Sequence, residues 1–443
     1  MWLPSKRLPP RQLPPKQPPN DRRPHPQTGL IGMKILLINH YAGSDRMGME
    51  YRPFYLAREW AADGHAVTVL GASFSHLRRL QPEVRADHDV TVEDGVRFRW
   101  LRTRPYRGNG SGRVVNMLTF VGKLLADAHR IAREERPDVV ICSSTYPLDI
   151  YPGARIARAA RARLVFEVHD LWPLTPVLLG GYSRRHPYIM LLQAAEDFAC
   201  RNADRVVSIL PDACDYMVGR GLEPAKFAHV PNGIPIAALQ AAAPEDLPSA
   251  IAARIAEERA RGRFLVGYAG GINPSNPVEA ILDSAVLLAG EPVSFILVGD
   301  GTSAPALRAR VERLGLDNFH MVGSIPKWTV QRFLSEMDAL SMPWRRSPLY
   351  RYGVSPNKMF DYMLSGRPIV QSCDASNDLV RDAQCGITVP PEDPAAYADA
   401  IRHLIRMTQS ERLRLGENGR RFVEQHHDYP IIASRFIAAL GPA

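Results

Sequence analysis

The chain has 443 residues, of which 45% are hydrophobic, and a formal charge of +9. This length exceeds what one hydrophobic core usually serves, so we expect two domains. Five of the nine excess charges lie in the first 32 residues, and no nucleic-acid-binding signature accompanies the rest, which argues against nucleic acid as a partner. Five cysteines without a Cys-x-x-Cys pair exclude a disulfide framework and a cysteine zinc site, and no apolar run of about 18 residues is present, so we expect a cytoplasmic protein.

The first 32 residues contain nine prolines and few apolar side chains. Such a segment cannot bury enough apolar surface to offset the entropy of ordering, so we expect residues 1–32 to form a disordered tail. Because Met33 directly precedes the first apolar run, we hypothesise that the functional protein begins there.

From Lys34 to Asn39 the chain carries a short apolar run of the kind that a buried parallel strand needs. A loop with Gly43 and Gly48, a helical stretch and a strand over Ala66–Leu70 follow, which together predict a βαβ unit. Further strands are predicted over Val96–Trp100, Val139–Cys142, Arg163–Val168 and Arg205–Ile209. We therefore predict a first Rossmann-like domain over residues 33–233.

The turn residues of 229–235 predict a hinge, and a helix is expected over Ala242–Arg261. The order of strand, glycine loop, helix and strand then returns, which predicts a second Rossmann-like domain over residues 234–425. Its elements are predicted as strands over Phe264–Ala269, Val293–Val298 and Ile369–Gln371 and helices over Pro277–Ala289 and Ser410–Gln425. We expect a last helix over Ile431–Leu440, within a segment 426–443 that crosses back to the first domain.

The strand over Arg163–Val168 ends in a cluster of ionisable and aromatic residues, His169, Asp170 and Trp172. In open parallel sheets, ligands bind beyond the carboxyl ends of the strands. His169 can move a proton or steady a developing charge there, or it can be a structural histidine bonded to the backbone beside Trp172. The sequence leaves both interpretations open.

A second cluster lies in the segment from Tyr350 to Met363, where Pro356 suits the first turn of a helix. The N–H groups after Pro356, the hydroxyl of Ser355 and the ammonium of Lys358 would then form an anion site suited to a leaving diphosphate. Asp361 follows Lys358 by about one turn, where a carboxylate can accept both hydroxyls of a ribose. The alternative is an ordinary capped helix with a surface Lys–Asp pair.

Other patterns are weaker. No glycine loop has the Gly-x-Gly-x-x-Gly spacing, which removes the main support for a nicotinamide dehydrogenase. Asp87-His88-Asp89 has the form of a metal-binding Asp-x-Asp motif, but a polar loop before the next strand explains it better, and we predict no metal site. The apolar stripe over residues 113–129 fits either the core or the surface of a membrane.

Several motifs together resemble the family 4 retaining glycosyltransferases of GT-B fold, and the likeness extends over nearly everything from Met33 onward. In the second half these are Val298-Gly299-Asp300-Gly301, the segment 321–327, and Ser355 to Pro368, together with Val230-Pro231-Asn232-Gly233 at the hinge. In the first half, Gly64-His65-x-Val67-Thr68-Val69 and Glu167 to Pro173 are similar to the subgroup that builds O-antigen, capsule and exopolysaccharide repeat units.

The resemblance implies two Rossmann-like doubly wound domains facing across a cleft. It implies a nucleotide diphosphate-sugar donor, often a uridine diphosphate-sugar, on the second domain and a glycan or polyprenyl-linked acceptor on the first, at the inner face of the cell membrane, with anomeric configuration retained and no cofactor. His169 matches the family's catalytic-site histidine, Gly48 lies in the loop that approaches the diphosphate, and Asp361 stands where the ribose-binding Glu is usual. The expected catalytic residues are His169 and Lys358, and His169, Asp170 and Trp172 form the expected acceptor side. The expected donor-binding residues are Gly48, Gly270, Gly271, Asn273, Gly299, Ser324, Ile325, Tyr352, Ser355, Asn357, Lys358 and Asp361.

The chain departs from the family pattern in two places. Tyr350 to Ser355 offers no carboxylate where many members carry the first Glu of a Glu, seven residues, Glu motif, and Gly271 and Asn276 occupy the region where an Arg and a Lys are common. Lys358 is then the best remaining cation for the diphosphate. A sugar-nucleotide epimerase of the same fold and a non-catalytic partner subunit remain alternatives.

Overall fold

The computed structural model describes residues 32–48, 51–108, 110–241, 245–274 and 276–441. Residues Met33 to Ala443 form one compact unit that contains two sheets. The expected tail over residues 1–32 lies outside the described residues, apart from Gly32.

The first sheet has eight strands in the order β3-β4-β2-β1-β5-β6-β7-β8, all parallel except the antiparallel β3–β4 pair at one edge. Residues alternate between its two faces: Ile35 and Leu37 of β1 enter one core, and Leu36 and Ile38 enter the other. This is why β1 reads as an unbroken apolar run. The strands are β1 (Lys34–Ile38), β2 (Ala66–Ala72), β3 (Asp89–Glu93), β4 (Val96–Leu101), β5 (Val139–Cys142), β6 (Arg163–Val168), β7 (Arg205–Ser208) and β8 (Phe227–His229).

Helices cover both faces of this sheet. Buried side chains of α2, α3 and α5 pack on one face, and those of α1 and α16 pack on the other. The helices of this half are α1 (Tyr51–Ala62), α2 (Ser111–Glu135), η1 (Pro147–Asp149), α3 (Ile150–Ala160), α4 (Leu174–Leu178), α5 (Pro187–Asn202), α6 (Cys214–Val218), η2 (Pro224–Lys226) and, from the end of the chain, α16 (Tyr429–Ala439).

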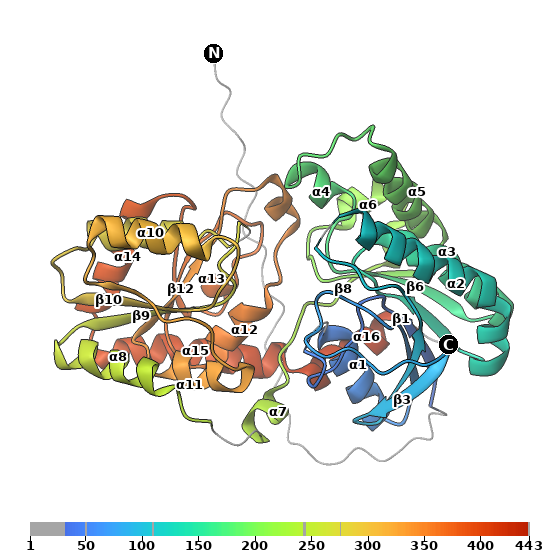
Figure 1. Ribbon diagram of the computed structural model, residues 1–443, viewed down its shortest axis with the longest axis horizontal. Coiled ribbons are helices and arrows are strands. Elements are labelled where there is room, and N and C mark those ends of the chain that lie inside the picture. The colour runs from blue at the N-terminus through green and yellow to red at the C-terminus, as the bar shows by residue number, and fades with distance from the viewer. Residues whose placement is uncertain (1–31, 49–50, 109, 242–244, 275, 442–443) are drawn as a thin grey trace. The chain divides into compact units, whose positions relative to one another are not determined.

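The second sheet has six parallel strands in the order β11-β10-β9-β12-β13-β14. Its strands are β9 (Phe264–Ala269), β10 (Val293–Val298), β11 (Phe319–Met321), β12 (Ala339–Pro343), β13 (Ile369–Ser372) and β14 (Gly386–Val389). Side chains of α8, α11, α12 and α15 pack on one face, and those of α9, α10 and α14 pack on the other (Figure 1). The helices are α7 (Ile236–Ala241), α8 (Ser249–Ala260), α9 (Glu279–Leu287), α10 (Ala304–Leu314), η3 (Lys327–Thr329), α11 (Val330–Ser335), η4 (Pro348–Tyr352), α12 (Asn357–Leu364), α13 (Leu379–Asp382), α14 (Pro394–Arg406) and α15 (Gln409–His426).

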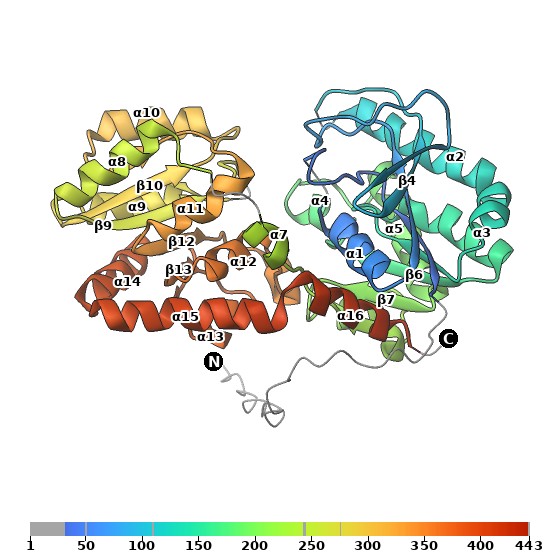
Figure 2. The same ribbon diagram turned by 90° about the horizontal axis from the view of Figure 1, so that it is seen from below.

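Two chain crossings join the sheets, and they meet. The first passes through residues 230–235 and the second through His427 and Asp428, and a parallel bridge pairs Ile234 with Asp428. Beyond the second crossing, α16 lies against α1, where the Trp60 indole N–H donates to the carbonyl of Ala433 at 3.1 Å (Figure 2). The last helix thus belongs to the core of the first sheet, while the boundaries proposed at 233 and 425 remain predictions.

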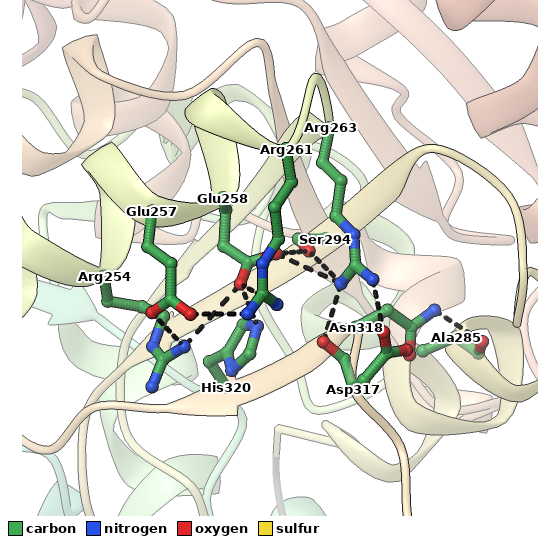
Figure 3. A network of polar contacts seen from close by, with 10 residues as sticks. All are labelled: Arg254, Glu257, Glu258, Arg261, Arg263, Ala285, Ser294, Asp317, Asn318 and His320. Atoms are coloured by element: carbon green, nitrogen blue, oxygen red, sulfur yellow. Dashed lines mark hydrogen bonds and ion pairs between the residues drawn. The ribbon is translucent and has the colours of Figure 1, made fainter.

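A buried carboxylate anchors the amino ends of the second sheet's strands. The side chain of Glu258 has no exposed surface and lies within 3.1 to 3.6 Å of Arg254, Arg261, Arg263 and His320 (Figure 3). Burial alone would raise the pKa of Glu258, but the Ser294 hydroxyl, His320 and Arg263 hold it below its usual value. Because a buried charge is tolerated only when it is paired, this cluster fixes α8 beneath β10 and β11.

Most predicted strands lie within two residues of the observed ones, and one helix was placed wrongly. Of the helix expected over Ala242–Arg261, residues 242–244 lie outside the described residues, residues 245–248 are not helical, and α8 begins at Ser249, after Pro248, because proline cannot donate a backbone hydrogen bond inside a helix. The break before the last helix falls at His427 and Asp428, and Pro430 sits in the first turn of α16.

Candidate functional site

A cavity of about 760 Å³ lies where the carboxyl ends of strands from both sheets meet. The first sheet contributes residues that follow β5, β6 and β7, and the second contributes loops after β9, β10 and β11 and the start of α12. Nine of the residues singled out from the sequence line it: His169, Asp170, Gly270, Gly271, Gly299, Ser324, Ile325, Asn357 and Asp361.

His169 enters the cavity directly after β6, with a side chain that is 15% exposed. Its Nε2 atom lies 3.0 Å from the Ser143 hydroxyl and 3.3 Å from a carboxylate oxygen of Glu167. Its neighbour Asp170 accepts hydrogen bonds from the Leu171 backbone N–H and the Thr175 hydroxyl, and burial raises the pKa of Asp170. An imidazole held in this way has a fixed orientation toward the cavity.

Helix α12 begins at Asn357, with Pro356 in the capping position just before the first turn. The Lys358 ammonium is partly buried, donates to the Asn276 side chain, and lies 3.4 Å from the Tyr268 hydroxyl. Burial lowers the pKa of Lys358 to about 8. Lys358 does not itself line the cavity, but its ammonium lies 3.4 Å from where a β-carbon on Gly270 would stand, and Gly270 does.

Asp361 lines the cavity on the next turn of α12. One carboxylate oxygen accepts a hydrogen bond of 3.2 Å from the Gln331 amide, and burial raises the pKa of Asp361 to about 6, against the opposing charge of Lys327. Its carboxylate oxygens are able to accept hydrogen bonds from a ligand.

At two positions in the loop after β10 only glycine fits, because the backbone of the loop after β9 passes too close for a β-carbon. A β-carbon on Gly299, whose φ is +144°, would stand 1.8 Å from the carbonyl oxygen of Gly270. A β-carbon on Gly301 would stand 2.2 Å from the carbonyl oxygen of Ile272. The loops after β9 and β10 therefore pack backbone against backbone, and the Gly270 N–H donates to the Val298 carbonyl while the Gly299 N–H donates to the Gly323 carbonyl.

The remaining expected site residues lie around the cavity without lining it. Ser355 bonds to Asn232, and the buried ring of Tyr352 packs against Tyr216 in the first domain's core. Trp172 lies under the guanidinium of Arg113. Asn273 and Gly48 stand behind lining residues: Asn273 accepts from Asn276, and Gly48, with φ +88°, packs against the side chain of Arg79, which lines the cavity.

A polar contact between the domains was not predicted from the sequence. The Lys327 ammonium donates to Asp45 at 2.7 Å and to the Tyr55 hydroxyl at 2.8 Å, and it lies 3.8 Å from the centre of the Tyr51 ring. All but Asp45 line the cavity. Lys327 ends the motif segment 321–327, but the sequence could not show that it contacts Asp45 and Tyr55, because these partners lie more than 270 residues away in the chain.

Arg79 and Arg52 also line the cavity and were not predicted as site residues from the sequence. Arg79 is exposed, and its guanidinium has no hydrogen-bond or ion-pair partner among the described residues. Arg52 is buried and bonded to Glu167, and it too reaches the cavity. The cavity therefore has cations on the first domain's side as well as on the second's.

The Asp-x-Asp-like segment lies outside the cavity and has partners of its own. Asp87 pairs with Lys123 at 2.7 Å, His88 pairs with Asp127 at 2.9 Å, and Asp89 accepts from two backbone N–H groups. Within the described ranges, no helix has both the length and the apolarity needed to cross a membrane.

Comparison with known proteins agrees with this arrangement. Residues 47–233 match the family described as "Glycosyl transferase 4-like domain", and residues 263–407 match "Glycosyl transferases group 1". Alpha-D-kanosaminyltransferase of Streptomyces kanamyceticus is 28% identical over 60% of this chain and 66% of its own length, just under two thirds. The putative colanic acid biosynthesis glycosyl transferase WcaI of Escherichia coli K12 is 22% identical over 86% of this chain and 93% of its own length.

Among solved structures, HepE of Anabaena in complex with UDP and glucose superposes with a TM-score of 0.63 at 17% identity, over 93% of this chain and 100% of that one. At this identity the likeness shows the fold alone. The chain is therefore a glycosyltransferase of GT-B fold, built from a glycosyl transferase 4-like domain and a glycosyl transferases group 1 domain, as the two family matches, the two α/β sheets and the structural neighbour together indicate.

Proposed function

We propose that the protein transfers a sugar, with retention of anomeric configuration and without a metal ion, from a uridine diphosphate-sugar to a hydroxyl of a glycan or lipid-linked acceptor in cell-surface polysaccharide synthesis. The observation that carries this proposal is one cavity that receives His169 from the first domain and Asp361 from the second. The donor is supported by HepE, which was solved in complex with UDP and glucose, and the pathway class by WcaI, which is named for colanic acid biosynthesis.

In this proposal Asp361 accepts the ribose hydroxyls, and the backbone around Ser324 and Ile325 meets the base. The diphosphate lies against Gly270, the start of α12 and the ammonium of Lys358, which stabilise the charge that develops as it leaves. The acceptor hydroxyl attacks from the His169 side, on the same face that the diphosphate leaves. Arg79 assists from the first domain.

The test is nucleoside diphosphate release from a panel of sugar nucleotides, with and without glycan and polyprenyl-phosphate acceptors, in the presence of a chelator. The expected result is release that depends on acceptor and survives the chelator, with a product of retained configuration by proton NMR. Conversion of the donor sugar without any acceptor would contradict the proposal, as would complete dependence on a divalent ion.

The acceptor side carries a surface suited to a membrane. Most of the apolar stripe over residues 113–129 is core, since Met117, Phe120 and Leu124 are buried, but Val115 and Leu118 are 56% and 46% exposed. Further exposed apolar residues lie nearby on α4, α5 and the loop between them: Leu178, Leu179, Tyr182, Met190 and Leu191. The Tyr188 hydroxyl lies 3.9 Å from the Met117 sulfur, so the starts of α2 and α5 are adjacent.

The two chain segments that carry these exposed apolar residues are basic, although Arg102 at the start of the first lies beside Asp87 and Asp89. Residues 102–119 and 171–195 hold six arginines and no aspartate or glutamate. Five of these side chains are exposed and have no ion-pair partner among the described residues: Arg102, Arg104, Arg107, Arg184 and Arg185. Exposed apolar side chains among unpaired cations fit an anionic lipid surface, so we propose that this face rests on the inner leaflet of the cell membrane.

Co-sedimentation with vesicles tests this part. Binding to phosphatidylglycerol vesicles, but not to phosphatidylcholine vesicles, is expected, and Leu179→Ser/Arg184→Gln should weaken it by roughly tenfold, because each basic residue near an anionic surface contributes about 1 kcal/mol. Leu314→Ser/Arg313→Gln on the exposed face of α10 is the matched control and should bind as the wild type does. Equal binding by both variants would overturn the assignment.

A further inference from the structure

Glu167 is a charged group that the proposed reaction does not touch. It is the next-to-last residue of β6, is 1% exposed, and lies beneath His169. One of its carboxylate oxygens accepts a hydrogen bond of 2.5 Å from the Ser143 hydroxyl and lies 3.3 Å from Nε2 of His169. Burying a carboxylate is costly, so its presence here calls for a partner and a purpose.

The partner is Arg52, from the second residue of α1, which is only 4% exposed. Its Nε atom donates to the other Glu167 oxygen at 2.9 Å. The two terminal nitrogens turn the other way, to the hinge: they donate to the carbonyls of Pro231 at 2.6 Å and Val230 at 3.0 Å. One guanidinium thus joins the carboxylate beneath His169 to the backbone that links the domains.

Asn232 continues the chain of contacts into the second domain. Its backbone N–H donates to the Ser355 hydroxyl at 2.9 Å, and its side-chain amide donates to the Ser355 carbonyl at 2.7 Å. Its own carbonyl lies 2.9 Å from Nδ1 of His427, at the second crossing. Ser355 precedes α12 by two residues, so the hinge residue is fixed to the loop that leads into Asn357 and Lys358.

We propose that Arg52 and Glu167 are positioning residues for His169: they set its tautomer and charge, and through the hinge carbonyls they hold it in register with the start of α12. The expected effect on turnover rests on the proposed function. The expected effect on the tautomer and charge of His169 does not.

The hydrogen bonds determine the tautomer. The Ser143 hydroxyl has one hydrogen and donates it to Glu167, so its contact with His169 requires Nε2–H as the donor. Burial by itself would raise the pKa of Glu167, but Arg52 and then His169 hold it at about 2, so its charge is constant over the working pH range. Besides Glu167, the buried Asp149 and the neighbouring Asp170 interact electrostatically with His169.

The first experiment measures the titration of His169 in the ligand-free protein by NMR of labelled histidine, with the signal assigned through His169→Gln. Glu167→Gln keeps the shape of the side chain and removes its charge. Because a carboxylate within 4 Å favours the imidazolium, the midpoint of His169 should fall by about one unit or more. Glu135→Gln is the matched control: it removes a mostly buried carboxylate of the same domain, paired with Arg97 and Arg99, and should leave the midpoint unchanged.

The second experiment compares kinetics. Glu167→Gln should lower kcat by about tenfold or more, because a fall of one unit in the His169 midpoint corresponds to about 1.4 kcal/mol. The donor KM should stay within about twofold, and the part of the pH profile that reports His169 should shift to lower pH. If Glu167 were merely structural, Glu167→Gln would instead lower the thermal midpoint and leave the titration of His169 and the pH profile as in the wild type. That result would overturn the proposal.

A further variant keeps the proposal testable if Glu167→Gln fails to fold. Arg52→Lys retains the charge beside Glu167 but cannot reach both hinge carbonyls, so the His169 midpoint should stay near that of the wild type while kcat falls by about tenfold. Wild-type kcat in Arg52→Lys would overturn the role of the hinge. If the wild type transfers sugar from no donor, the proposed function fails, whereas a shifted midpoint in Glu167→Gln still supports the positioning of His169.

Discussion

Replacing Lys358 by methionine should make the ligand-free protein more stable and a worse enzyme. Burial lowers the pKa of this lysine from 10.5 to about 8. Below pH 8 the folded protein therefore carries a buried positive charge that destabilises it relative to the unfolded chain. At about 1.4 kcal/mol per pKa unit, the shift corresponds to about 3 kcal/mol at most, and the contacts with Asn276 and Tyr268 that methionine loses offset part of it. We expect a net gain of about 1 to 2 kcal/mol at pH 7.

The direction of this stability change can be checked by varying the pH. As pH rises from 8 to 10.5, the folded lysine is already neutral while the unfolded one is still charged, so the wild type gains stability and the advantage of Lys358→Met should shrink. Lys34→Met, at an exposed position, serves as the control and should leave stability near that of the wild type at either pH. Urea unfolding at pH 7 and at the alkaline end of the range measures both variants.

Ligand binding should change in the opposite direction. Loss of a charge-assisted hydrogen bond to a phosphate oxygen costs about 1.5 to 3 kcal/mol, so Lys358→Met should bind UDP roughly 10- to 150-fold more weakly at pH 7 by calorimetry. Wild-type affinity should fall above pH 8, where Lys358 loses its proton, and the variant's should not. A variant that is less stable than the wild type and binds UDP equally well would refute the reasoning.

Other perturbations have equally specific outcomes. Asp361→Asn should lower UDP affinity and abolish any preference for UDP over 2′-deoxy-UDP in calorimetry, and wild-type binding should weaken as pH falls through about 6, where Asp361 takes up a proton. Gly299→Ala should destabilise the protein by several kcal/mol in thermal unfolding, because its β-carbon meets a carbonyl, whereas Gly290→Ala, at φ +84° with nothing within 4 Å, should cost only about 1 kcal/mol. Glu258→Ala should cost about 3 to 5 kcal/mol in urea unfolding with an unchanged donor KM, whereas Glu417→Ala, which removes a surface pair that is half exposed, should cost less than about 1 kcal/mol.

Strands were predictable where burial on both faces of the sheet requires an unbroken run of apolar residues. The apolar runs at β1, β5, β6, β9 and β10 are bounded by turn residues, so their positions could be read directly. The three-residue β8 and β11 carry too few residues for such a pattern, and they exist because neighbouring strands pair with them.

The candidate site was predictable where it follows a strand. His169, Gly270 and Gly299 come immediately after β6, β9 and β10, and a parallel sheet brings such positions to one edge. Arg52 and Lys327 could not be found in this way, because each depends on partners over a hundred residues away in the chain. Lys358 shows the same limit, since the pattern places it on α12 but cannot show that Asn276 and Tyr268 receive it.

The paired crossings at Ile234 and Asp428 have a practical consequence for dissecting the enzyme. Helix α16 follows the second sheet in the chain yet is buried in the first sheet's core, and α7 precedes the second sheet yet packs in its core. Cutting the chain between α7 and α8 therefore leaves each piece with a helix that packs in the other. Two separately expressed fragments divided there should assemble without a covalent link, whereas removing α16 exposes Trp60 and the face of α1 that it covers.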